Sequence, residues 1–470
     1  MAIFQTSIYP NVVPVNGLVK KYLASGSQIS AGDFVQFAST CSIGTPTVVT
    51  TTDTAVVQIL QLNDTDVIVF GSKSAVAVRI SGGLISTGAV AEIGDDYMQF
   101  SSAAKLTDTC VLIGFTYERT SGASTVRGRG AYANVLTISG LNITVGTPQK
   151  VYTVSTDSSE SVGSVNVAAA TSASGVIVYG ILISSSDSAG SRVGANVIQV
   201  TESGFTVGTQ YGLPTNTTPD TGASSPYVYC IQVGDGHVLV CSNVLGFRTA
   251  IATTSGDTIT YGTTTSPSGT GSGNIFKPYM LTDSTGIFLN GSNAYAFRID
   301  SGTITLGSKT ALSNGVEDYT TPDQTGCAVM TANKVVATAR GMAACIAISD
   351  SLELTIGEWV IAGYTPVHVS PSVIPIRLSS TTLVFCGGGT KTCTVDDMTL
   401  ILGSSMRKMG KGIYFAAQDT FLLAYYSESY SLNLSIVSFM VEAYSSTIYG
   451  VASTTAEDGG EIQVFLPPGN

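Results

Sequence analysis

Short runs in which apolar and polar residues alternate recur along the whole chain, separated by turns rich in Gly, Ser, Asn and Asp. The runs are rich in Val, Ile, Thr and Tyr, and no long segment repeats apolar residues at the i, i+3, i+4, i+7 spacing of an amphipathic helix. Alternation with a period of two is typical of a half-buried β-strand. The pattern therefore predicts an all-β protein.

One unit returns along the chain: an apolar strand, followed by a hairpin whose last strand ends in a glycine. The hairpins are ISGGLISTG, TISGLNITVG, VTESGFTVG, TTSGDTITYG, IDSGTITLG, ISDSLELTIG and TVDDMTLILG, and they end at Gly88, Gly146, Gly208, Gly262, Gly307, Gly357 and Gly403. The strands ahead of them are DVIVF, TCVLIGF, GVIVYGI, HVLVC, GIFL, KVVATA and TLVFC. The average spacing of these glycines is about 52 residues, close to the length of a propeller blade.

A repeated small antiparallel sheet predicts a β-propeller, because radial stacking covers the faces of each sheet and leaves only short edges. Two pieces near the ends do not complete a repeat: the strand TFLLAYY (420–426) and the orphan hairpin FVQFASTCSIGTPTVV (34–49). These pieces either join as an eighth blade completed by both termini, or belong to a small terminal β-module outside seven blades. We favour seven blades over residues 53–408, with a discontinuous β-module formed by residues 1–52 and 409–470.

Composition narrows the class of protein. Of the 470 residues, 44% are hydrophobic and only 11% are charged, against about 25% charged in an average globular domain. Such a chain is not intrinsically disordered, since disorder needs high charge and few apolar residues. The net charge of -11 and the lack of a Lys/Arg-rich run disfavour the phosphate contacts of nucleic-acid binding. We expect no nucleic-acid partner.

The chain also lacks features of export or membrane insertion. Its first residues, MAIFQTSIYPNVV, have no basic segment ahead of an apolar stretch, so they make a poor signal peptide. The longest apolar runs, such as GVIVYGILI (175–183), reach about half of a membrane span. We expect synthesis in a cytoplasm without membrane insertion.

Cysteine and histidine give little support for a metal site. The eight cysteines form no CxxC pair, and the two histidines, His237 and His368, are far apart in the chain. Small buried thiols in strands are the simpler interpretation. Cys386 and Cys393 flank the turn GGGTKT and could face each other across a hairpin, although a reducing compartment argues against a disulfide.

The common catalytic motifs are missing from the sequence. There is no GxSxG elbow and no Walker-type GxxxxGK[ST], the motifs of α/β-hydrolases and P-loop proteins. NDTD (63–66) is interpreted as a turn before DVIVF, and acidic residues at other turns as caps, because Asp accepts local backbone N–H bonds. We predict a non-enzymatic protein without cofactor or metal.

Long polar loops are the candidate binding surfaces, because loops on a rigid scaffold often carry binding. They span 183–195, 212–226 and 263–273 and are rich in Ser, Thr and Gly. Tyr227 and Tyr229 alternate on one strand face, for which cross-strand packing is the competing interpretation. The candidate binding residues are Asn216, Asp220, Tyr227, Tyr229, Ser266 and Ser268.

The two ends of the chain carry a further pattern, with an opening strand pair around AGD and a closing pair around DGG. Its residues are Ala24, Gly26, Ile29, Ala31, Gly32, Asp33 and Val35 near the start, and Gly450, Val451, Ala452, Gly459, Gly460, Ile462, Val464, Leu466 and Pro467 near the close. This pattern resembles the terminal segments of many bacteriophage virion proteins, where it builds a small β-barrel-like module. The central repeats are similar to propeller-like regions of phage tail and fibre proteins.

The resemblance implies a virion component of the tail or capsid surface, assembled in the host bacterial cytoplasm. The chain departs from a simple fibre because it has no collagen-like or coiled-coil stalk, which favours a globular attachment, adaptor or decoration role. We therefore expect a non-enzymatic structural protein that forms a homo-oligomer and packs against other virion proteins. The alternative is an adhesin that binds a host receptor or surface glycan through its Gly/Ser/Thr-rich loops; a glycan hydrolase is the least favoured hypothesis.

Overall fold

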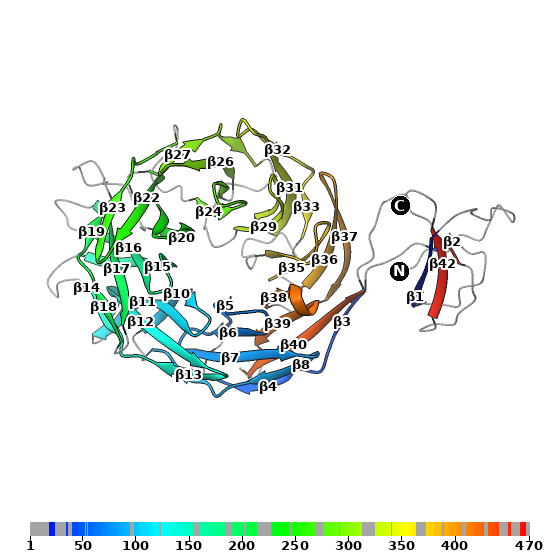
Figure 1. Ribbon diagram of the computed structural model, residues 1–470, viewed down its shortest axis with the longest axis horizontal. Coiled ribbons are helices and arrows are strands. Elements are labelled where there is room, and N and C mark those ends of the chain that lie inside the picture. The colour runs from blue at the N-terminus through cyan, green and yellow to red at the C-terminus, as the bar shows by residue number, and fades with distance from the viewer. Residues whose placement is uncertain are drawn as a thin grey trace.

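The computed structural model contains eight small antiparallel sheets that stand radially around a centre, and a further four-stranded sheet beside this ring (Figure 1). The described residues are 18–23, 34–35, 40–51, 53, 55–94, 98–121, 124–153, 160–183, 190–201, 204–213, 227–244, 246–267, 276–290, 292–312, 325–339, 341–362, 373–387, 390–406, 410–426, 431–440, 450–452 and 461–466. The radial sheets are blades 1 to 8, and each has strand positions A to D from the centre outwards.

Positions A and B form the inner half of each blade. Position A is held, from blade 1 to blade 8, by β5 (Gln58–Gln61), β10 (Met98–Thr107), β15 (Glu160–Ala169), β20 (Val228–Gly234), β24 (Lys277–Met280), β29 (Thr325–Thr331), β34 (Ile374–Arg377) and β38 (Lys411–Phe415). Position B is held by β6 (Asp66–Phe70), β11 (Cys110–Ser121), β16 (Ser174–Ile183), β21 (His237–Ser242), β25 (Thr285–Leu289), β30 (Lys334–Ala339), β35 (Thr382–Cys386) and β39 (Thr420–Tyr426).

Positions C and D form the outer half. Position C is held by β7 (Ser74–Ser81), β12 (Ser124–Ser139), β17 (Gly190–Thr201), β22 (Arg248–Ser255), β26 (Asn293–Asp300), β31 (Met342–Ile348), β36 (Thr390–Asp396) and β40 (Ser431–Met440). Position D of blades 1 to 7 is held by β8 (Leu84–Thr87) with β9 (Ala91–Glu92), β13 (Asn142–Val145) with β14 (Gln149–Thr153), β18 (Gly204–Val207) with β19 (Tyr211–Gly212), β23 (Thr258–Tyr261), β27 (Thr303–Leu306) with β28 (Thr310–Ala311), β32 (Leu354–Ile356) with β33 (Val360–Ile361), and β37 (Thr399–Met406).

The eighth blade is closed by the start of the chain. Its position D consists of β3 (Thr40–Ile43) and β4 (Thr47–Thr50), which pair with β40 from Thr40 opposite Met440 to Thr50 opposite Ser431. A short 3-10 helix, η2 (Ala416–Gln418), connects positions A and B of this blade. The predicted all-β propeller is confirmed, with the eight blades that the sequence left open.

The preference for seven blades therefore needs correction. Residues 40–50, 411–426 and 431–440, which the seven-blade hypothesis assigned to the terminal module, make up blade 8. Gly44 plays the part of the blade-ending glycine in this blade: its N–H donates to the Ile436 carbonyl at 2.9 Å. The repeat was hard to recognise because its outer strand lies near the start of the chain and its other three strands near the end.

The core is divided into layers, each shared by two consecutive blades. In β6, Val67 and Val69 pack into the layer shared with blade 8, whereas Ile68 and Phe70 pack into the layer shared with blade 2. Phe70 stacks on Phe100 of blade 2 with 4.7 Å between ring centres. Because B strands are covered on both faces, they are continuous apolar runs without a polar side. This explains the DVIVF-like segments of the repeat.

Five of the blade-ending glycines, Gly88, Gly208, Gly262, Gly307 and Gly357, lie where the next blade approaches closely. Their N–H groups donate to strand C of their own blade, as in Gly88 to Ala77 O and Gly307 to Ala296 O, both 2.9 Å. A Cβ atom would lie 1.8 Å from the Leu141 carbonyl oxygen at Gly88, and 2.1 Å from that of Leu352 at Gly307. Leu141 and Leu352 lie in the turn between strands C and D of the next blade. Only glycine leaves room for that turn.

The two chain ends form the separate sheet, in the strand order β1 (Leu18–Leu23), β42 (Glu461–Leu466), β41 (Gly450–Ala452), β2 (Phe34–Val35). Tyr22 is opposite Ile462, and Val35 is opposite Gly450. Of the terminal residues that carry the resemblance, Val35, Gly450, Val451, Ala452, Ile462, Val464 and Leu466 lie in these strands, and the others lie outside the described residues.

We predict that Gly307→Ala destabilises the fold by about 1–3 kcal/mol, the usual cost of overpacking a close contact, because its Cβ would collide with the Leu352 carbonyl of the next blade. Gly212→Ala is the matched control, since a Cβ there would stand 3.7 Å from its nearest neighbour, Val193 O. Thermal unfolding should show a lower melting temperature for the first variant only. Equal melting temperatures would contradict the docking role of the glycine.

Candidate functional site

The connections between strands emerge at two opposite faces of the ring. Neighbouring strands within a blade are antiparallel, so the A–B and C–D turns share one face, and the B–C and D–A connections share the other. The D–A connections include the segments that follow Leu213 and Pro267 in the chain. The described ends of the loops proposed from the sequence, at Ile183, Leu213, Tyr227 and Pro267, therefore lie at one face, which we call the loop face.

Three of the candidate residues, Asn216, Asp220 and Ser268, lie outside the described residues. Ser266 is exposed in the D–A connection of blade 4. The backbone N–H of Tyr227 donates to the Asn243 side chain at 2.8 Å, which fixes the entry into β20. Tyr229 packs against the core shared by blades 4 and 5 and also lines the central channel. The structure thus brings one candidate, Tyr229, into a cavity.

That cavity is a central channel of about 900 Å³, lined by the A strands of all eight blades. The lining includes three lysines, Lys105, Lys277 and Lys411, and no Asp or Glu is present among the described lining residues. The channel thus carries positive groups in a chain whose net charge is -11. These lysines were not among the residues expected from the sequence, where each is a single cation inside or next to a short strand.

Polar side chains of the channel connect neighbouring A strands. The Gln58 amide donates to Ala103 O at 3.0 Å and accepts from Ala103 N at 2.9 Å, which links blades 1 and 2. Asn166 accepts from Cys230 N at 3.0 Å between blades 3 and 4, and the Tyr279 hydroxyl donates to Thr325 O at 3.0 Å between blades 5 and 6. An innermost strand has one edge without a partner strand, so these bonds satisfy backbone groups that would otherwise depend on water.

The three lysines have different surroundings. Lys105 forms an ion pair with Asp108 at 2.7 Å and also donates to Leu62 O. Lys411 donates to Val57 O, across the junction of blades 8 and 1. Lys277 instead has its Nζ 5.8 Å from the ring centre of Tyr229 and 5.7 Å from that of Tyr279, within the range of cation–π attraction. Burial raises the pKa of the Tyr279 phenol, and the adjacent Lys277 ammonium opposes that rise.

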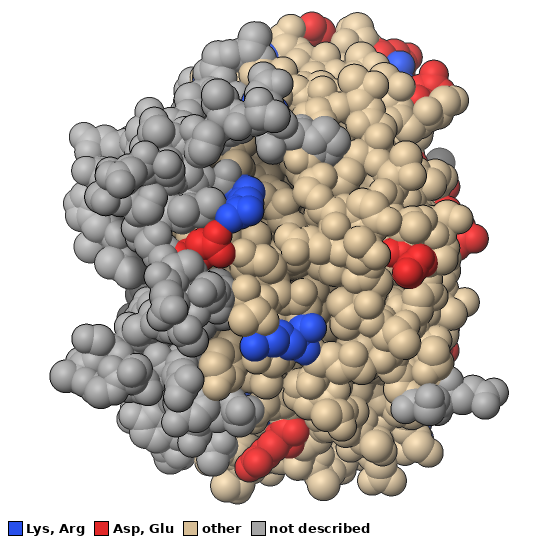
Figure 2. Space-filling view, turned by 90° about the vertical axis from the view of Figure 1, so that its left-hand side faces the viewer, with Lys and Arg blue, Asp and Glu red and all other residues tan. Residues whose placement is uncertain are grey.

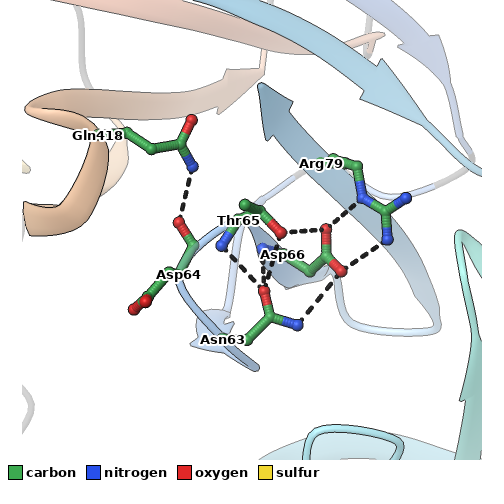
Figure 3. A network of polar contacts seen from close by, with 6 residues as sticks. All are labelled: Asn63, Asp64, Thr65, Asp66, Arg79 and Gln418. Carbon is green, nitrogen blue, oxygen red and sulfur yellow. Dashed lines mark hydrogen bonds and ion pairs between the residues drawn. The ribbon is translucent and has the colours of Figure 1, made fainter. Parts of the chain in front are cut away.

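The predicted turn at NDTD is a compact polar network on the face opposite the loop face (Figure 3). The Asn63 side-chain oxygen accepts from the N–H groups of Thr65 and Asp66, both at 2.9 Å. Arg79 makes two bonds to the Asp66 carboxylate, at 2.7 and 2.8 Å. Gln418 of blade 8 donates to Asp64 O at 2.7 Å. The Asp66 carboxylate is thus occupied by an internal guanidinium, and the turn helps to join blade 8 to blade 1.

A second carboxylate lies at the same junction, where the chain passes from β4 to β5. Asp53 is only 2% exposed. It accepts from Ser72 Oγ at 2.6 Å, from Lys73 N at 2.9 Å and from Ser74 Oγ. A Cβ on Gly71 would lie 2.1 Å from the Asp53 carboxylate oxygen. Asp53 therefore fastens the passage into blade 1 to the B–C turn of that blade, a role for which the sequence held no clear signal.

Most of the described cysteines are buried thiols, as expected, whereas Cys110 and Cys327 are partly exposed. Cys393 is opposite Leu383 in the β35–β36 pairing, so the expectation that it faces Cys386 is wrong; both are free thiols. Burial raises the pKa of Cys241 and of Cys393 to about 12, so both are neutral at pH 7. Among the described residues, no three His, Cys, Asp or Glu side chains gather in a way that could hold a metal. Nor does any described helix have the length and apolar character needed to cross a membrane.

Comparison with known proteins gives no family. No family model matches the chain, and no curated protein matches it. Solved structures do show similarity, among them a putative 6-phosphogluconolactonase from Bacteroides fragilis, with a TM-score of 0.46 and 12% sequence identity. That alignment covers 70% of this chain and 90% of the other.

We predict that Asp66→Asn lowers the free energy of unfolding by about 1–3 kcal/mol at pH 7, typical of losing a charged hydrogen-bonded pair. The hydrogen bonds from Arg79 hold the pKa of Asp66 below its usual value, against the opposing effect of burial. A lowered folded-state pKa contributes stability above the unfolded pKa of about 3.9 and loses it as the pH falls through the folded value. The difference between wild type and variant should therefore shrink below about pH 4.

Urea unfolding at pH 7 and at pH 3 measures this difference. Arg79→Gln is the companion variant, and the double variant should lose little more stability than either single one, because both remove the same pair. Additive losses, or a difference that is unchanged at pH 3, would contradict the assigned pairing.

Proposed function

We propose that this protein is a non-enzymatic structural component of a bacteriophage virion, with its propeller mounted through the sheet made by the two chain ends. The observation that carries the proposal is that the two chain ends pair with each other twice, once inside the ring and once outside it. β3 and β40 pair with each other in blade 8, and beyond them the ends pair again as β1 with β42. Both ends of the chain thus leave the ring at one blade and form one sheet, through which the protein could attach. The other blades then remain accessible to further partners.

The surface supports a role in an assembly. On the side of the ring that carries β18, β19 and β23, charged side chains are few and scattered over a largely uncharged described surface (Figure 2). A protein that remains a solitary solute benefits from surface charge, whereas one packed against neighbours can present Ser, Thr and apolar groups. We propose that these neighbours are further copies of the chain and other virion proteins of the tail or capsid surface.

The second candidate function is a virion adhesin for a host receptor or surface glycan. It is favoured by the loop face, where the described parts of the D–A connections that carry Tyr227 and Ser266 emerge. Hydroxyl and amide groups on such loops suit many weak hydrogen bonds to a saccharide. The two functions are compatible with one architecture, since one uses the terminal sheet and the other uses the loop face.

We predict that removing residues 1–38 and 442–470 leaves a folded propeller, because β3, β4 and β40 are retained, but abolishes oligomer formation and incorporation into particles. Analytical ultracentrifugation, circular dichroism and antibody labelling of purified virions measure the three properties. A variant that lacks residues 1–51 is the control for ring closure and should have a much lower melting temperature. Normal incorporation of the first variant would contradict the mounting role.

We predict that replacing residues 214–226 with a Gly/Ser linker of equal length leaves particle assembly intact. Loss of host adsorption by these particles would support the adhesin function. Unchanged adsorption would remove support for this loop as a receptor contact, and loss of particles would identify it as an assembly interface. Particle yield and adsorption rate are the measurements.

A further inference from the structure

One lysine of the central channel, Lys277, has aromatic rings as its neighbours. Lys277 lies at the start of β24, beside two tyrosine rings, Tyr229 on β20 and Tyr279 on its own strand. Its side chain is partly exposed and lines the cavity. Rings that stack against an ammonium group provide weak attraction, and they restrict the positions that the group can occupy. Lys277 is thus a positioned positive charge on the wall of a cavity.

The charge of Lys277 is not balanced by an ion pair in the described part of the chain. The ion pairs there join Arg79 to Asp66, Lys105 to Asp108, Arg192 to Glu160 and Lys334 to Asp397. Lys105, the channel lysine that does pair with a carboxylate, lies near the opposite end of its A strand, close to the A–B turn. Within the described residues, Lys277 is therefore a positive centre without a paired carboxylate, at the end of the A strands that adjoins the loop face.

We propose that the central channel binds a small molecule bearing an oxyanion group, a carboxylate, sulfate or phosphate, and that Lys277 holds that group. An ammonium group offers three hydrogen-bond donors to an oxyanion, and its attraction for an anion is stronger in a cavity than in bulk water. The cavity, about 900 Å³, is within the size range of small-molecule sites. Tyr229 and Tyr279 act as positioning residues for Lys277. The proposal is independent of the virion role, since it concerns neither the terminal sheet nor the loops.

Calorimetric titration of the full-length protein tests the proposal with sulfate, inorganic phosphate and glucuronate as separate probes, and glucose as the neutral comparison. At least one anion should bind, more weakly as NaCl is added, because salt screens the attraction. Comparing glucuronate with the inorganic ions distinguishes a carboxylated sugar from a free oxyanion. Tighter binding of glucose than of every anion, or binding of no anion, would overturn the proposal.

Lys277→Gln should weaken the binding of that anion by about tenfold or more, whereas Lys277→Arg should retain it because the charge is kept. Lys309→Gln is the matched control, since Lys309 is exposed between β27 and β28 at the outer position D of blade 5, outside the channel lining. It should bind as the wild type does. Equal affinity of Lys277→Gln and wild type would overturn the assignment of Lys277.

A second measurement does not depend on a variant that folds. Wild-type crystals soaked in selenate should show an anomalous peak within hydrogen-bonding distance of Lys277 Nζ. A peak elsewhere in the channel, or only on the outer surface, would overturn the site. Heparin, a long polyanion, should not compete with the small anion; competition would identify an open charged surface instead of an enclosed site.

Discussion

The close contact between a blade-ending glycine and the next blade is the constraint on which the ring depends. It is found at Gly88, Gly208, Gly262, Gly307 and Gly357. At Gly88, Gly307 and Gly357 a single added carbon would collide with a carbonyl oxygen in the following C–D turn. The missing side chain lets the outer edges of two blades meet, and the apolar layers between them can then close. Those layers cover both faces of every B strand, which is why Val67 and Ile68, adjacent in the chain, belong to different layers. Local backbone geometry and burial are thus coupled in these repeats.

A ring of blades also needs a seam, and here the seam joins blade 8 to blade 1. The backbone pairing of β3 and β4 with β40 completes blade 8, and polar contacts add to it. Gln418 reaches Asp64, Lys411 reaches Val57 O, and Asp53 is buried against the Ser72–Ser74 turn. Since the seam gathers both chain ends at one blade, the terminal sheet follows directly from it. Ring closure and the proposed mounting of the protein therefore have the same structural origin.

The central channel results from the radial arrangement of the eight blades, because their A strands surround the axis. Eight A strands present one edge each to the axis, and side chains such as Gln58, Asn166 and Tyr279 bind backbone groups of the neighbouring blade. Most polar groups of the channel therefore have a structural role. Lys277 differs because its described neighbours are aromatic rings, which restrict its position without neutralising its charge. This difference is what makes it a candidate for ligand binding among the channel residues.

The sequence by itself determined the repeat, the all-β class and the propeller, because alternation, apolar B strands and the recurring glycine are local patterns. It also determined that NDTD is a turn, since Asn and Asp bond to their own backbone. Only the tertiary structure decided the number of blades, because β3 and β4, on either side of Gly44, complete their sheet with strands near the other end of the chain. It alone placed Cys393 opposite Leu383, and gathered Lys277, Tyr229 and Tyr279 at one wall of the channel. Such contacts join residues whose separation along the chain carries no signal of their proximity in space.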